Sequence, residues 1–117
     1  MPFSSEDWGT QYLMSYVQCA VEAFKFASGH YPRDVDLDTT PAGDTVLDLI
    51  SRPCGGFRSG STRTNVYTGE LALPLNGLAT TPGDVGYLPI EDNSEVVGYV
   101  VNGFGIVEEF FRIEVLP

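Results

Sequence analysis

The chain has 117 residues, of which 43% are hydrophobic and 19% are charged. This composition excludes disorder caused by low hydrophobicity, and the length predicts that residues 1–117 form a single domain with its own core. Sixteen acidic residues against six basic ones give a net charge of −10, which argues against a nucleic-acid partner and against anionic membranes. No run approaches the roughly 18 apolar residues of a membrane span, and no signal peptide is recognisable.

The first third of the sequence predicts a helix from Glu6 to Ser28. Apolar residues recur there at spacings of three and four, which places them on one stripe that faces a core. The stripe comprises Trp8, Tyr12, Leu13, Tyr16, Val17, Ala20, Val21, Phe24 and Ala27. Gly29 stands where a helix-ending glycine belongs, and Pro32 prevents the helix from resuming.

A second, shorter helix is expected to run to Ile50. Thr40 is a suitable N-cap for it, and Pro41 suits the first helical position. The residues that follow, 54–65, are rich in Gly, Ser, Arg and Thr and are expected to form a loop within the domain.

The second half of the sequence is typical of strands. The expected strands are Asn65–Tyr67, Glu70–Leu75, Val85–Ile90, Glu95–Val101 and Val107–Val115, with turns at Asp92-Asn93-Ser94 and Asn102-Gly103. Because Val96–Val101 is apolar on both faces, it should be the central strand. The predicted fold class is α+β: a long N-terminal amphipathic helix packed on a C-terminal antiparallel β-meander, with the short helix and the loop between them.

Two cysteines, Cys19 and Cys54, allow one disulfide. In the chain-entropy model, the loop that it would close contributes about 4 kcal/mol of stability. The bridge is expected in an extracytoplasmic protein, whereas in the cytosol both thiols would stay reduced. The alternative is two unlinked thiols, one on the helix and one in the loop.

No arrangement of residues indicates catalysis. The only histidine, His30, has no second histidine for a metal pair, and no phosphate loop is present. The chain is therefore expected to be neither an enzyme nor dependent on a cofactor.

Calcium is a weaker alternative at Asp34, Asp36 and Asp38, whose spacing is that of a calcium loop. Thr39 and Thr45 occupy the glycine and bidentate-glutamate positions of such a loop. The favoured interpretation is an extended segment with Val35 and Leu37 pointing inward and the three aspartates in water. A second acidic turn, residues 91–95, is interpreted in the same way.

Three aromatic residues, Trp8, Tyr12 and Tyr16, lie on one ridge of the predicted helix. Such a ridge is usually core packing. The alternative is an interface with a neighbouring subunit, since Trp and Tyr are enriched at interfaces.

Residues 20–32, Ala-Val-Glu-Ala-Phe-Lys-Phe-Ala-Ser-Gly-His-Tyr-Pro, carry a resemblance to a known family. A helix that ends in an Ala-hydrophobic-Glu-Ala-aromatic run, followed by Gly and Tyr-Pro, resembles the type IV pilin and type II secretion pseudopilin superfamily. The close match covers about the first 50 residues, and the rest agrees in the order of its elements. The cleavage site and apolar segment that open such proteins do not precede Trp8 here, and the aspartate-rich calcium loop of the major pseudopilins is not recognisable.

The resemblance implies a non-catalytic subunit of an extracellular filament, with this chain as its head domain. The expected partners are other pilin-like subunits. The parent protein is expected to be extracytoplasmic and anchored in a membrane by a preceding apolar helix, and the head alone is expected to be monomeric. Two alternatives remain open: a small secreted module that binds a protein or a glycan, and a small hydrolase with an acid pair.

Overall fold

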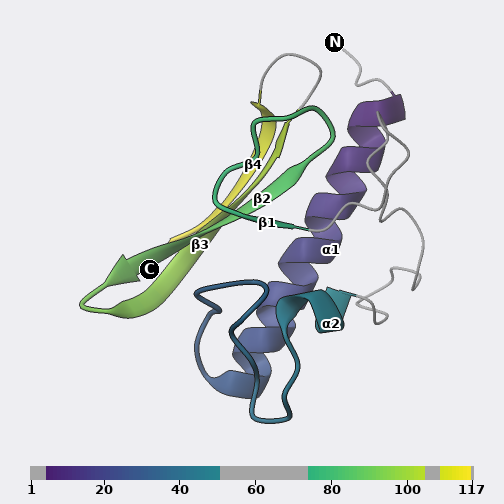
Figure 1. The fold of residues 1–117 in the computed structure, drawn as a ribbon. Helices are drawn as coiled ribbons and strands as arrows, with labels where there is room; N and C mark the ends of the chain where they lie inside the picture. The colour runs from purple at the N-terminus through teal and green to yellow at the C-terminus, as the bar shows by residue number, and fades with distance from the viewer. Residues whose placement is uncertain (1–4, 51–73, 105–108, 117) are drawn as a thin grey trace.

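The fold is α+β, as the order of the elements predicts. The computed structural model describes the backbone of residues 5–50, 74–104 and 109–116, and the side chains within 13–50, 74–104 and 112–116. Its elements are α1 (Ser5–Ser28), α2 (Val46–Ile50), β1 (Leu75–Asn76), β2 (Val85–Asp92), β3 (Glu95–Phe104) and β4 (Glu109–Val115). Helix α1 lies along the sheet and α2 packs beside α1 (Figure 1).

Over residues 13–28, α1 buries the stripe that the sequence predicts. Leu13, Tyr16, Val17, Ala20, Val21 and Phe24 form one core cluster with Tyr87, Tyr99 and Val101 of the sheet. Ala27, which was expected on the stripe, is exposed. No helix in the described part of the chain is long and apolar enough to cross a membrane.

Gly29 ends α1 as predicted. Its φ is +84°, and its N–H donates to the carbonyl of Lys25 at 2.7 Å. Glycine adopts this left-handed conformation without the steric penalty that a Cβ brings, so the chain can leave the helix sharply.

The predicted start of the second helix is wrong. Residues 41–43 form a turn, in which Gly43 has a φ of +89° and donates its N–H to the carbonyl of Thr40. The helix begins at Val46 instead, after Thr45. The Thr45 hydroxyl accepts the N–H of Asp48, and the Asp48 carboxylate accepts the N–H of Thr45. This reciprocal pair is a capping box, a stronger start signal than a Thr-Pro pair followed by glycine.

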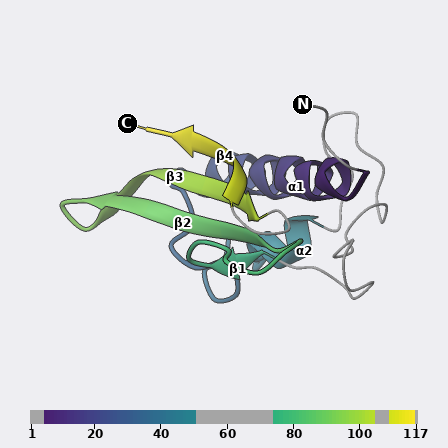
Figure 2. The same ribbon diagram turned by 90° about the horizontal axis from the view of Figure 1, so that it is seen from above.

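The sheet is mixed, not wholly antiparallel as predicted. Its order is β1-β2-β3-β4, with antiparallel pairing from β2 to β4 and parallel pairing between β1 and β2. Figure 2 shows the three long strands side by side with the short β1 beyond β2. Of the predicted strand 70–75 only residues 74 and 75 are described, and the strand found there is Leu75–Asn76. The predicted strand 65–67 and residues 107–108 of the predicted strand 107–115 lie outside the described residues.

β3 is the central strand of the meander, as its apolar character predicts. The turn before it is also confirmed, because Asp92 pairs with Glu95 and the two residues between them have positive φ. The predicted turn at Asn102-Gly103 is wrong. β3 continues through both residues to Phe104, and the side chain of Asn102 bonds a neighbouring segment instead of its own backbone.

Candidate functional site

The connection that leaves α1 is fixed to the sheet by three tyrosines. The ring of Tyr31 meets Tyr99 edge-on, with centroids 5.1 Å apart, and Tyr99 lies 5.6 Å from Tyr87. The Tyr87 hydroxyl donates to the carbonyl of Pro32 at 2.5 Å. The Tyr99 hydroxyl donates to Glu22 Oε2 of α1 at 2.6 Å. The helix, the connection and two strands are therefore joined at one point.

Both hydroxyls are held in their neutral form. Burial raises the pKa of Tyr87 well above its usual range, and the negative charge of Asp38 raises it further. Burial also raises the pKa of Tyr99, and the hydrogen bond to Glu22 adds to the increase because it needs the proton. Both tyrosines act as hydrogen-bond donors in the junction.

A groove of about 500 Å³ opens beside this junction, between the end of α1 and the β2–β3 hairpin. Its wall includes the side chains of Lys25, His30, Tyr31, Arg33, Asp38 and Glu95. A volume of this size is within the range of small-ligand sites. The groove therefore gathers the only lysine and the only histidine of an acidic chain.

Arg33 fixes one wall of the groove to the hairpin. Its Nη2 donates to the carbonyl of Ser94 at 2.6 Å and lies 3.1 Å from Glu91 Oε1. The pair is about half exposed, so the contact contributes position more than energy. Because both contacts are on the hairpin, the connection and the hairpin tip are held at a fixed separation.

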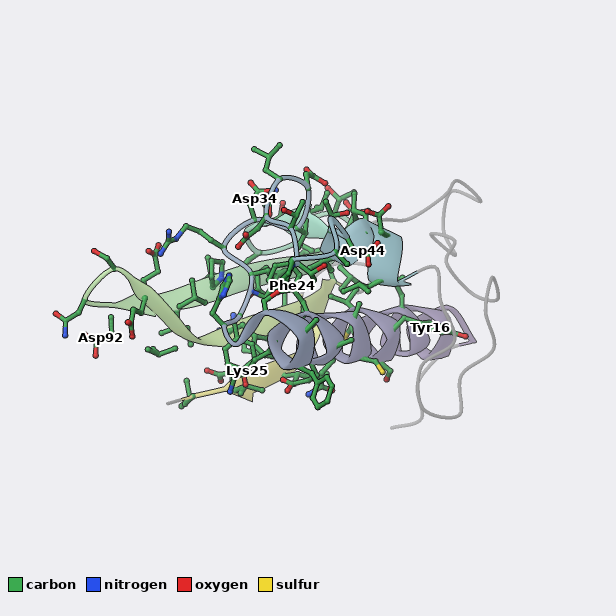
Figure 3. All side chains as sticks on the ribbon, turned by 90° about the horizontal axis from the view of Figure 1, so that it is seen from below. Tyr16, Phe24, Lys25, Asp34, Asp44 and Asp92 are labelled. Carbon is green, nitrogen blue, oxygen red and sulfur yellow. The ribbon has the colours of Figure 1, made fainter. Side chains whose placement is uncertain are left out.

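Lys25 and His30 are held less tightly. His30 Nε2 lies 3.7 Å from Asp38 Oδ2, while its ring meets Phe24 edge-on. Lys25 Nζ lies 4.5 Å from the centroid of the Tyr31 ring, and no ion pair of Lys25 is present within the described part of the chain. Figure 3 shows Phe24 and Lys25 leaving α1 on different sides. The lysine is thus a cation at a groove wall with a ring as its neighbour.

The acidic segment 34–38 builds its own loop. Asp34 Oδ1 accepts the N–H groups of Asp36 and Leu37, and Asp38 Oδ2 accepts the N–H of Arg33. No group of three acidic, histidine or cysteine side chains suited to a metal occurs among residues whose side chains are described. Val35 points inward as predicted, but Leu37 is 80% exposed because the turn at Asp34 carries it outward.

The proposed disulfide is described at one end only. Cys19 on α1 is in the disulfide form. Cys54 lies outside the described residues, so the pairing of the two stays a prediction.

Of the three residues on the aromatic ridge, only Tyr16 has a described side chain. Tyr16 is 3% exposed and belongs to the core, so within this chain it packs inward and offers no surface to a neighbouring subunit. The side chains of Trp8 and Tyr12 lie outside the described set. An interface on this ridge would therefore depend on those two residues.

Several residues of the junction and the groove were not anticipated from the sequence. Glu22 and Tyr99 meet across the helix–sheet contact, and Arg33 reaches Glu91 through the hairpin. Tyr99, the tyrosine within the apolar run 96–101, was the one sequence feature that could have indicated the contact with Glu22, since a buried hydroxyl needs a hydrogen-bond partner. Nothing local indicated the partner of Arg33.

Comparison with known proteins gives no match: no family model, no curated protein and no solved structure matches the chain.

Proposed function

We propose that this chain is the head domain of a type IV pilin-like filament subunit, with a structural and non-catalytic role. The observation that carries the proposal is the junction at Gly29–Pro32. The residues that resemble the family lie at this junction. Gly29 ends the helix, Tyr31 packs against Tyr99 of the sheet, and the carbonyl of Pro32 accepts a hydrogen bond from the Tyr87 hydroxyl. A head domain needs such a joint, because it must hold its sheet in a fixed place on a helix shared with the filament.

Two further observations support the proposal. The long N-terminal helix of the proposed subunit would bury its sheet-facing stripe, as α1 does between residues 13 and 28. Cys19 is in the disulfide form, which suits an oxidising compartment outside the cytoplasm. In the proposed subunit, an apolar helix preceding this chain anchors the protein in the membrane before assembly, and other subunits of the filament are its partners.

The proposal is tested on the native gene and in the native cell. We expect the coding sequence before residue 1 to specify a cleavage site and then about twenty apolar residues that continue the helix. An antibody against this domain should label filaments in material sheared from the cell surface, and cells lacking the gene serve as the control. Absence of such an upstream segment, or recovery of the antigen only as free protein, would contradict the filament role.

The groove favours a second candidate function, a module that binds a small carboxylate ligand such as an acidic sugar. Lys25 supplies a cation, and Tyr31, Val96 and Val97 supply apolar surface in the same wall. A carboxylate on Lys25 would form the ion pair that the described acidic residues do not provide.

Titration with D-glucuronate, followed by two-dimensional NMR, tests the groove. We expect glucuronate at millimolar concentration to shift the amide signals of Lys25, Tyr31 and Arg33, and uncharged D-glucose to leave them unchanged. Lys25→Met should abolish the shifts, whereas Arg112→Met, which removes a cation from β4, should preserve them. This function would be excluded if glucose shifted the same amide signals as glucuronate does. It would also be excluded if glucuronate shifted the signals of Lys25→Met and Arg112→Met equally.

A further inference from the structure

Among the described strands, β4 lies at one edge of the sheet and pairs with β3 alone. Figure 2 shows β4 on the side of β3 that is opposite to β2. Helix α1 packs on β2 and β3. An edge strand presents backbone N–H and C=O groups that another strand can pair with.

The sequence of β4 lacks two residue types that commonly protect an edge. Lysine and proline are both absent from Glu109–Val115. Ile113 and Val115 pack against the core from one face, and Arg112 and Glu114 are exposed on the other. Leu116, directly after the strand, is 63% exposed. The edge is therefore a seven-residue strand with one cation, Arg112, two anions, Glu109 and Glu114, and an exposed apolar residue directly after it.

We propose that β4 pairs with β4 of a second copy of this chain, antiparallel and centred on Ile113. In this register Arg112 of each copy lies opposite Glu114 of the other, on the exposed face of the joined sheet. Directly opposed cross-strand pairs of opposite charge stabilise a sheet. The two-fold symmetry gives two such pairs for one strand contact.

The charges select this register over its neighbours. A two-fold axis normal to the joined sheet keeps each side chain on the same face in both copies. It also places one residue of β4 directly opposite the same residue of the second copy. If that residue were Arg112, two arginines would be opposed, and if it were Glu114, two glutamates would be opposed. With Ile113 at the centre, position 115 lies opposite 111 and position 116 opposite 110, and all four are apolar in the sequence. The strand is thus complementary to itself.

The pairing would join two sheets into one continuous sheet across the dimer. This dimer differs from the monomer that the sequence predicts for the head domain alone. The sequence predicts a monomer because the preceding apolar helix is the element through which subunits are expected to assemble. It does not depend on the filament role, since it uses the chain alone. The contact is that of one strand pair, so we expect a weak dimer that is visible at high protein concentration.

Sedimentation velocity over a range of concentrations, with four forms of the chain, tests the proposal. The unchanged chain should dimerise, and Arg112→Glu or Glu114→Arg alone should weaken the dimer about tenfold or more, because each opposes like charges twice. The double variant R112E/E114R should restore it, because the two charges exchange places. A mixture of the two single variants should form a heterodimer.

Asp92→Arg is the matched control for Glu114→Arg, since it also replaces an acidic residue with arginine, at the exposed hairpin turn, and it should leave the dimer unchanged. Circular dichroism establishes that each variant is folded. A chain that remains monomeric to about 1 mM overturns the proposal. So does a dimer that both single variants leave intact, or one that the double variant fails to restore.

Discussion

Replacing Phe24 with alanine is expected to lower the free energy of unfolding by about 3–5 kcal/mol. Phe24 is fully buried in the cluster that joins α1 to the sheet, and its ring also meets His30 edge-on. Truncation removes the buried ring and leaves a cavity that the helix and the strands can close only in part. For a domain whose total stability is about 5–15 kcal/mol, this is a large fraction.

Phe26→Ala is the matched control, because it makes the same change two residues along the same helix. Phe26 is 95% exposed, so its truncation should change the stability by no more than about 0.5 kcal/mol. Urea unfolding followed by circular dichroism measures both variants. Similar losses from the two, or a loss below about 1 kcal/mol at Phe24, would show that the helix is not packed on the sheet through this ring.

The parts of the fold that could be predicted are those that a regular pattern specifies. The stripe from Leu13 to Phe24 faces the core because apolar side chains at helical spacing lie on one face. Gly29 ends the helix because its backbone can adopt a positive φ, and the central position of β3 follows from valines on both of its faces. In each case the signal is contained in a short stretch of sequence.

The parts that failed depend on a partner distant in the sequence or on a competing local signal. Asn102-Gly103 is a common turn pair, but Asn102 finds its partners on Ala79, so the strand continues. Thr40-Pro41 is a common helix start, but Gly43 turns the chain and the capping box at Thr45 starts the helix later. Local propensity was overridden in the first case and misidentified in the second.

The candidate groove was less predictable than the fold for the same reason. Lys25 and His30 are close in sequence at the end of one helix, yet the hairpin that completes the groove comes from residues 94–97. Arg33 defines the separation of its walls by reaching Glu91 and Ser94. A single sequence contains no periodicity that relates such positions.

Asn102→Ala is expected to lower the free energy of unfolding by about 2–4 kcal/mol. Asn102 is 1% exposed on β3. Its Oδ1 accepts the N–H of Ala79 at 2.8 Å, and its Nδ2 donates to the carbonyl of Ala79 at 3.1 Å. Alanine at position 102 would leave the N–H and the carbonyl of buried Ala79 without these hydrogen bonds. Each group would still be removed from water in the folded state, and this uncompensated desolvation destabilises the fold.

The close packing of this region leaves little room for a replacement partner. A Cβ on Gly86 would lie 2.3 Å from the carbonyl oxygen of Gly77 and 2.7 Å from Asn102 Oδ1. The segment that contains Gly77 and Ala79 therefore lies directly on β2. Asn102→Asp should also destabilise the fold, because its carboxylate keeps an acceptor for the N–H but sets a second oxygen against the Ala79 carbonyl.

Asn76→Ala is the control, since Asn76 is an exposed asparagine with a similar pair of contacts. Its Oδ1 accepts the N–H of Val35 at 3.0 Å, and its Nδ2 donates to Asp36 at 3.4 Å. Water can replace it there, so the loss should be about 1 kcal/mol. Urea unfolding at one temperature gives both values. If the two asparagines proved equivalent, Asn102 would not be the group that binds this segment to the sheet, and the continuation of β3 past Gly103 would need another cause.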